Sequence, residues 1–185
     1  KKTPDKPFFL FHSAQAVHLP SFAGRAFKGK TKAGPHGDFI FELDYIVGRL
    51  IRKLDQLGYG ENPLVLFTSD NGPWLIKNQG KIDGTLERDH GGSAGVLRSG
   101  KVSTWEGGQR VPTVFWAPDR IRPNTTCNAL ASTLDVLPTF AALAGAKVPK
   151  DRDLDGEDIT HLLAGRVEEA RADKVYHFYL RTTLQ

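Results

Sequence analysis

Residues 64–72 read Leu64-Val65-Leu66-Phe67-Thr68-Ser69-Asp70-Asn71-Gly72, an apolar run that ends in an acid, an amide and a glycine. A short apolar run of this kind predicts a fully buried parallel strand. Ligands of open α/β sheets gather at the carboxyl ends of such strands, which makes Asp70 and Asn71 candidate site residues. Their oxygens suit Ca²⁺ or Mg²⁺. The same residue types also favour an ordinary turn, and the run alone leaves both interpretations open.

The flanking sequence alternates predicted strands and helices. We expect buried strands at Pro7 to Phe11 and Pro112 to Ala117, and a last strand at Val175 to Leu180. Apolar residues spaced three and four apart predict an amphipathic helix from Asp38 to Leu57, and a second apolar helix is expected from Ser132 to Ala144. This alternation predicts an α/β fold with a largely parallel sheet flanked by helices.

Single residues mark the ends of these predicted elements. Asp38 suits the start of the first helix and Gly58 its end, while Gly145 is placed to stop the second helix. Pro138 must lie in the first turn of that second helix or kink it. A glycine-rich segment runs from Gly72 to Gly108, and a loop of that length inside a domain is usually functional.

Composition excludes several classes of protein. The chain has 185 residues, of which 39% are hydrophobic and 25% charged, as in ordinary globular proteins. Its net charge is +4, but the cations are spread along the chain and mixed with acids, which indicates mild affinity for anions and gives no case for nucleic acid. The longest apolar runs are too short to cross a bilayer. A single cysteine, Cys127, excludes an internal disulfide and a cysteine-based metal site.

Two further residues add chemistry to Asp70 and Asn71. His18 closes the loop that follows the first predicted strand, and Lys101 lies within the glycine-rich segment. A metal pair, a histidine and a lysine at one sheet edge can bind and polarise a tetrahedral oxyanion. Without such a context, His18 is an ordinary loop histidine and Lys101 a solvated surface lysine.

An ordered set of motifs resembles one protein family. The set comprises Pro7 to Phe11 with His18-Leu19-Pro20, Gly37-Asp38 with Glu42-Leu43-Asp44, Phe67 to Gly72, Leu97 to Lys101, Thr104 to Pro112, Leu134 to Thr139, and Leu154-Asp155-Gly156. It resembles the carboxyl-terminal half of the formylglycine-dependent sulfatases of the alkaline-phosphatase superfamily, closest to the arylsulfatase A type. The resemblance covers residues 7–165. It implies a single partial sulfatase domain over residues 1–185, incomplete at both ends, in which residues 166–185 begin a carboxyl-terminal subdomain.

The resemblance implies a role for each candidate residue. Asp70 and Asn71 would be metal ligands of an active-site Ca²⁺, with Mg²⁺ as the alternative. Lys101 and His18 would be catalytic: Lys101 would hold a sulfate oxygen, and His18 would contact the sulfate or the bridging ester oxygen and help to protonate the leaving group. We assign Trp105, Glu106 and Arg110 to structure, as a buried aromatic and an ion pair that shape the glycine loop, and Asp135 to a helix cap.

The family's nucleophile is absent from this chain. Formylglycine is made from the first residue of a Cys/Ser-x-Pro-x-Arg motif, and neither Cys127 nor the near miss Ser21-Phe22-Ala23-Gly24-Arg25 fits it. The family's paired aspartates, which complete the metal site, are also missing. We therefore expect the formylglycine in a missing amino-terminal half of the same protein. This chain would supply half of the active site and be inactive alone.

Three functions remain to be compared. The leading one is hydrolysis of sulfuric esters carried by a small molecule or a glycan, in an extracytoplasmic protein (periplasmic, secreted or lysosomal), as the resemblance implies. The alternatives are a phosphate or phosphonate ester hydrolase of the same superfamily and a non-catalytic binding module. Residues 76–93 would choose the substrate, where Lys77, Lys81 and Arg88 favour an anionic glycan and Trp74 offers a stacking surface.

Overall fold

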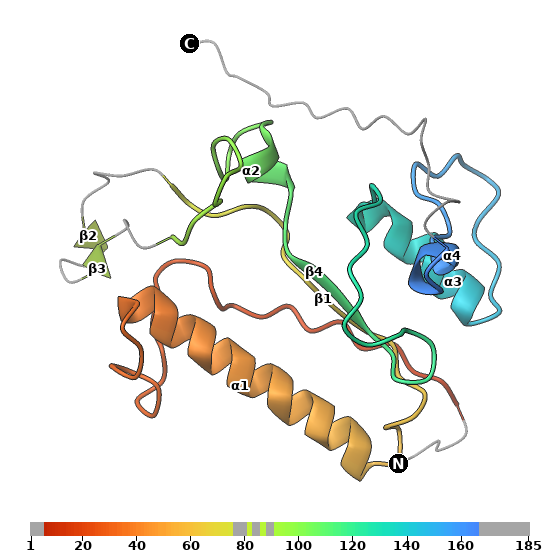
Figure 1. Ribbon diagram of the computed structural model, residues 1–185, viewed down its shortest axis with the longest axis horizontal. Helices are drawn as coiled ribbons and strands as arrows, with labels where there is room; N and C mark the ends of the chain where they lie inside the picture. The colour runs from red at the N-terminus through yellow and green to blue at the C-terminus, as the bar shows by residue number, and fades with distance from the viewer. Residues whose placement is uncertain (1–5, 76–80, 83–85, 88–90, 167–185) are drawn as a thin grey trace. The chain divides into compact units, whose positions relative to one another are not determined.

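The computed structural model describes residues 6–75, 81–82, 86–87 and 91–166 (Figure 1). The elements in chain order are α1 (Gly34–Gln56), β1 (Val65–Thr68), β2 (Lys81–Ile82), β3 (Leu86–Glu87), α2 (Glu106–Gln109), β4 (Thr113–Trp116), the 3₁₀ turn η1 (Thr133–Asp135), α3 (Val136–Leu143) and α4 (Thr160–Leu163). The chain divides into two compact units. In the described part, the first unit takes residues 6–11, 61–64 and 115–166, and the second takes residues 12–60 and 65–114.

Helix α1 is the long amphipathic helix predicted from the sequence, but it starts earlier than predicted. It begins at Gly34 rather than Asp38, because Pro35 sits in the first turn, where its missing N–H costs nothing. Its end agrees with the prediction: Gly58 adopts a φ of 75°, and the N–H of Tyr59 donates to the carbonyl of Leu54 at 2.9 Å.

Asp38 is not the helix cap but a buried anchor for the preceding loop. Its carboxylate accepts the N–H of Gly29 at 2.6 Å and the N–H of Thr31 at 2.8 Å. These two bonds favour the charged form of the side chain, and they lower the pKa of Asp38 below its ordinary value. The loop of residues 24–33 is thereby tied to the first turns of α1.

Strands β1 and β4 confirm two predicted strands, in shortened form, and together make a two-stranded sheet. The predicted full burial is wrong for both, because Phe67 remains 39% exposed and Val114 56% exposed. Among the described residues each strand has a single strand neighbour, so the sheet faces are not covered as they are in a complete α/β domain.

The predicted first strand, Pro7 to Phe11, is not part of a sheet. Phe8, Phe9, Leu10 and Phe11 are 57% to 79% exposed. The ring of Phe9 packs edge-on to Phe140, with centroids 5.9 Å apart. A strand needs a ladder partner, and the described part of the chain provides none for this segment.

The second predicted helix divides into η1 and α3. Ser132 caps it, and Asp135 completes a capping box by accepting the N–H of Ser132 at 2.7 Å. Pro138 lies in the first turn of α3 as expected, and Gly145 with a φ of 66° follows its end. Asp135 also accepts the N–H of Glu157 at 2.9 Å, so the predicted cap residue holds a distant loop as well.

The glycine-rich segment has little regular structure. Strands β2 and β3 form an antiparallel pair that joins Lys81 to Glu87 and Ile82 to Leu86. Helix α2 is a single turn. The predicted strand at Val175 to Leu180 lies outside the described residues. Among the described helices, none has both the length and the apolar composition needed to cross a membrane.

Candidate active site

Asp70 and Asn71 follow β1 after one residue, Ser69, at the end where Thr68 meets Thr113 of β4. The two threonine hydroxyl oxygens lie 3.0 Å apart. The Ser69 hydroxyl donates to the Asn71 carbonyl at 3.1 Å and fixes the turn after the strand. Asp70 is exposed and Asn71 is half-buried, so both remain accessible to a ligand.

Glycines bring Lys101 against the chain that follows Asn71. The N–H of Lys101 donates to the carbonyl of Pro73 at 2.8 Å, and the N–H of Gly72 donates to the carbonyl of Gly108 at 3.0 Å. A Cβ at Gly72 would overlap the carbonyl oxygen of Gly107, and a Cβ at Gly100 would overlap that of Pro73. Only glycine permits this approach. Three of the four candidate residues, Asp70, Asn71 and Lys101, therefore lie on adjoining backbone segments.

The loop around Lys101 is closed by its own polar groups. The Ser103 hydroxyl donates to the carbonyl of Gly100 at 2.8 Å, and the Gln109 side-chain amide donates to the carbonyl of Ser103 at 2.8 Å. The N–H of Gly107 donates to the carbonyl of Arg98 at 2.9 Å. Lys101 is half-buried within this closed loop, unlike an ordinary surface lysine.

Trp105, Glu106 and Arg110 take part in local contacts, with one correction. Trp105 is 50% exposed rather than buried. Its ring lies under the guanidinium of Arg98, whose carbon is 3.6 Å from the ring centroid. Glu106 and Arg110 form the predicted ion pair at 3.4 Å, and both side chains are largely exposed. The aromatic therefore stabilises the loop through a cation–π contact at the surface.

His18 lies on the loop of residues 12–24 and is exposed. Its Nδ1 is 2.6 Å from the carbonyl oxygen of Leu19, and because a carbonyl can only accept, Nδ1–H donates this bond. Within the described residues, no hydrogen bond or ion pair joins His18 to Asp70, Asn71 or Lys101. The structure thus places three candidates on adjoining segments and His18 on a separate loop.

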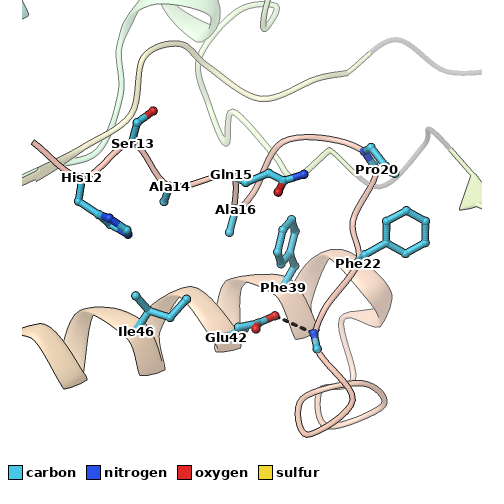
Figure 2. Close-up of a pocket in the computed structure, with 11 residues that line it drawn as sticks. His12, Ser13, Ala14, Gln15, Ala16, Pro20, Phe22, Phe39, Glu42 and Ile46 are labelled. Atoms are coloured by element: carbon cyan, nitrogen blue, oxygen red, sulfur yellow. Dashed lines mark hydrogen bonds between the residues drawn. The ribbon is translucent and has the colours of Figure 1, made fainter.

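A pocket of about 400 Å³ lies between the loop of residues 12–24 and helix α1 (Figure 2). It is lined by His12, Ser13, Ala14, Gln15, Ala16, Pro20, Phe22, Gly24, Phe39, Glu42 and Ile46. Glu42 provides a carboxylate, which accepts the N–H of Gly24 at 2.8 Å. Ala16 and Pro20 lie two residues before and after His18, so the pocket is lined by the same loop that carries His18. Sequence reasoning missed this pocket because its residues share no motif.

The donor set for a metal is partial. In the described part of the chain, no group of three or more His, Cys, Asp or Glu side chains comes together. Asp70 and Asn71 offer oxygens of the type that Ca²⁺ accepts, whereas Ca²⁺ takes about six to eight such ligands. The chemistry of these two residues fits a hard cation, and their number does not complete a site.

The predicted substrate loop lies mostly outside the described residues. Lys77, Arg88 and His90 are among the undescribed residues, and only the backbone of Lys81 is described, in β2. Trp74 is half-buried, and its backbone forms an antiparallel bridge with Gly91. Its predicted stacking role stays a prediction.

Comparison with known proteins gives one consistent result. Residues 1–146 match the family described as Sulfatase. The chain is 42% identical over 173 residues to arylsulfatase A of Homo sapiens and 40% identical over 178 residues to steryl-sulfatase of Rattus norvegicus. These matches cover 94% and 96% of this chain but 32% and 30% of the two relatives. The chain thus spans about a third of their length.

Solved structures agree with the sequence relatives. One match is a structure whose title concerns the metabolism of multiple glycosaminoglycans by Bacteroides thetaiotaomicron. It has a TM-score of 0.77 and 31% sequence identity, and the match covers 92% of this chain and 35% of that one. A sulfatase from Pseudoalteromonas sp. matches with a TM-score of 0.74 and 31% identity, covering 88% and 31%. The predicted α/β fold of the alkaline-phosphatase-like sulfatases is thereby confirmed. Since the family match extends over most of the chain and the relatives agree along nearly all of it, the chain belongs to the sulfatase family.

Proposed function

We propose that this chain supplies part of the active site of a sulfate ester hydrolase. The observation that carries the proposal is the hydrogen bond from the N–H of Lys101 to the carbonyl of Pro73, 2.8 Å long. It holds a half-buried lysine beside the segment that bears Asp70 and Asn71. A cation next to hard oxygen donors is the arrangement needed to bind a tetrahedral oxyanion.

Lys101 would hold a sulfate oxygen and neutralise charge as the ester bond breaks. His18 in its imidazolium form would protonate the leaving oxygen from Nε2–H, because the carbonyl of Leu19 already accepts Nδ1–H and orients the ring. In this assignment a proton reaches the alkoxide or phenoxide as the bond to sulfur is cleaved. The pairing of His18 with Leu19 supports the orientation of the ring.

Asp70 and Asn71 would bind Ca²⁺, with Mg²⁺ as the alternative, through a carboxylate and an amide oxygen. A bound hard cation would polarise the sulfate group as a Lewis acid. The remaining ligands and the formylglycine would come from an amino-terminal part of the same protein, because no Cys/Ser-x-Pro-x-Arg motif occurs in this chain. We accordingly propose that the chain alone is inactive and that its natural substrate is a sulfated small molecule or glycan met outside the cytoplasm.

The first experiment measures hydrolysis by the full-length natural protein. Kinetics with an aryl sulfate and the matching aryl phosphate would be combined with peptide mapping for formylglycine. We expect a preference for the sulfate and a mapped formylglycine outside residues 1–185. Faster hydrolysis of the phosphate would favour the phosphatase alternative. Hydrolysis of neither substrate, together with no formylglycine, would favour the non-catalytic binding module.

Lys101→Met tests the site residue directly. Removing a charge that stabilises the transferring group is expected to lower kcat/KM about 100-fold or more. Lys150→Met is the matched control, because Lys150 is exposed and lies in the other unit. A Lys101→Met protein with the activity of the control would contradict the assignment of Lys101.

A further inference from the structure

The loop of residues 24–33, which precedes helix α1 in the chain, is strongly basic. It carries Arg25, Lys28, Lys30 and Lys32 and contains no acid. The whole chain has 25 Lys and Arg against 21 Asp and Glu, so these four cations equal its entire excess of positive charge. All four are exposed. Cations are mixed with acids over the chain as a whole, but in this basic loop four cations occur without an acid.

Backbone bonds wind the basic loop into a defined turn. The N–H groups of Phe27 and Lys28 both donate to the carbonyl of Gly24, at 2.8 and 3.1 Å. The N–H of Lys30 donates to the carbonyl of Phe27 at 3.2 Å, and Gly29 adopts a φ of 72° that suits glycine. The lysines therefore project from a folded loop rather than from an unstructured tract.

Side chains of helix α1 pack against this loop and bind its backbone. The ring of Phe27 packs against Phe41, with centroids 5.8 Å apart, and against Tyr45, with centroids 5.2 Å apart. Asp38 accepts the N–H groups of Gly29 and Thr31. These contacts fix the loop, so less conformational entropy is lost when its cations meet a ligand.

The two carboxylates that hold the loop bind its backbone rather than its cations. Asp38 is buried and bound to backbone N–H groups, and Glu42 accepts the N–H of Gly24. Within the described part of the chain, no ion pair engages Arg25, Lys28, Lys30 or Lys32. The loop therefore presents its positive charge to solvent.

We propose that the basic loop binds an extended sulfated polysaccharide at a surface outside the candidate active site. The inference rests on the proposed function, under which the substrate carries sulfate groups. Several exposed cations on one loop match a chain of regularly spaced sulfates, and binding releases the counterions of that chain. A single-stranded nucleic acid fits less well, because it needs aromatic rings on the loop itself for stacking, and Phe27, the one aromatic in residues 24–33, is packed against Phe41 and Tyr45.

The position of the basic loop would bring a bound polysaccharide close to a candidate catalytic residue. Gly24, its first residue, lines the pocket between residues 12–24 and α1. A polymer held by the lysines would be attached close to the segment that carries His18. Polymeric substrate would then be concentrated near the site, whereas a small aryl sulfate would gain nothing from the loop.

The test uses the full-length natural protein on immobilised heparin, with Lys28, Lys30 and Lys32 all changed to alanine. We expect at least a tenfold weaker binding at low salt. The slope of log affinity against log salt should fall by about two to three, because about 0.7 to 0.9 is lost for each cation removed. The matched control changes Lys53, Lys147 and Lys150 to alanine, which removes the same charge from exposed positions elsewhere.

Further variants and ligands distinguish specific binding by the loop from misfolding and from a bulk-charge effect. Retention of heparin binding by the Lys28→Arg, Lys30→Arg, Lys32→Arg protein would support the proposal and exclude loss of folding as the cause. Equal loss of binding in the control would overturn it, since bulk charge would then explain the effect. Tighter binding to duplex DNA or to phosphatidylserine vesicles than to heparin would also overturn it. Turnover of a small aryl sulfate should be unchanged in the alanine protein, and its absence in the unmodified protein would count against the proposed function alone.

Discussion

Asp135 shows how much one buried side chain can hold together. It has no exposed surface and accepts N–H groups from Ser132 and Glu157. Asp135→Ala would remove the acceptor of both N–H groups and leave a cavity at a buried position, so we expect the free energy of unfolding to fall by about 2 to 4 kcal/mol. Urea denaturation of the full-length natural protein would measure the change.

The control for Asp135 is Asp151→Ala. Asp151 pairs with Arg152 at 2.9 Å, but both side chains are about two-thirds exposed. An exposed pair of this kind adds little to stability, and the midpoint of denaturation should stay unchanged. Equal shifts in the two variants would contradict the role given to Asp135.

Sequence reasoning at the residue scale worked where residue type dictates chemistry. The cap role of Asp135 was predictable because an acid before an apolar helix favours capping. Its second bond to Glu157 was not, because that contact spans a long sequence separation. The same limit explains why Asp38 was taken for a cap: local sequence does not show that the loop of residues 24–33 folds back onto it.

At the scale of elements, glycine substitutions should have opposite effects at two positions. A Cβ at Gly72 would overlap the carbonyl of Gly107, so Gly72→Ala is expected to destabilise the protein by about 2 to 4 kcal/mol. A Cβ at Gly48 would meet only the end of the flexible Arg52 side chain, at 3.3 Å. Gly48→Ala should therefore stabilise helix α1 by up to about 1 kcal/mol. Thermal unfolding of both variants would check the two signs.

The basic loop should loosen in acid. The N–H groups of Gly29 and Thr31 bind the charged form of Asp38 and lower its pKa in the folded state. A group of this kind stabilises the fold fully above the ordinary carboxyl pKa of about 3.9, and the contribution is lost as pH falls through the lowered value. Amide hydrogen exchange at Gly29 and Thr31 should therefore lose protection below about pH 4. In Asp38→Asn the same amides should show no such step.

The helices and strands were largely predictable because their periodicity is local. Helix α1, the strands β1 and β4, and the helix that begins at Ser132 all follow from apolar spacing and end residues. The close contact between the chain after Asn71 and the Lys101 loop was not predictable in detail. Hydrogen bonds from Lys101 to Pro73 and from Gly72 to Gly108 depend on segments that meet only in the folded chain.

At the scale of the whole molecule, we expect the exposed segment at Pro7 to Phe11 to lower solubility. Phe8, Phe9, Leu10 and Phe11 are consecutive and 57% to 79% exposed, and exposed apolar surface promotes association. We expect the 185-residue chain expressed alone to self-associate, and Phe11→Asp to reduce light scattering at equal concentration. Val96→Asp is the control, because Val96 is fully exposed and lies outside this segment. Equal effects of the two changes would show that added charge, not loss of the apolar surface, is responsible.

The fold class was predictable from the alternation of elements, while burial was not. Apolar composition suggested buried strands at Pro7 to Phe11, Leu64 to Thr68 and Pro112 to Ala117. In the described structure the first is not in a sheet and the other two are partly exposed. An apolar pattern indicates that a segment favours burial. It does not reveal which neighbouring strand provides that contact.

The stacking of Arg98 on Trp105 gives the Lys101 loop an optical reporter of its own. Indole fluorescence responds to a charge held against the ring, and here the guanidinium carbon is 3.6 Å from the ring centroid. The chain has only two other tryptophans, Trp74 and Trp116, and replacing both with phenylalanine isolates one emission band. A change in that band on adding inorganic sulfate would follow the loop in solution without any attached dye.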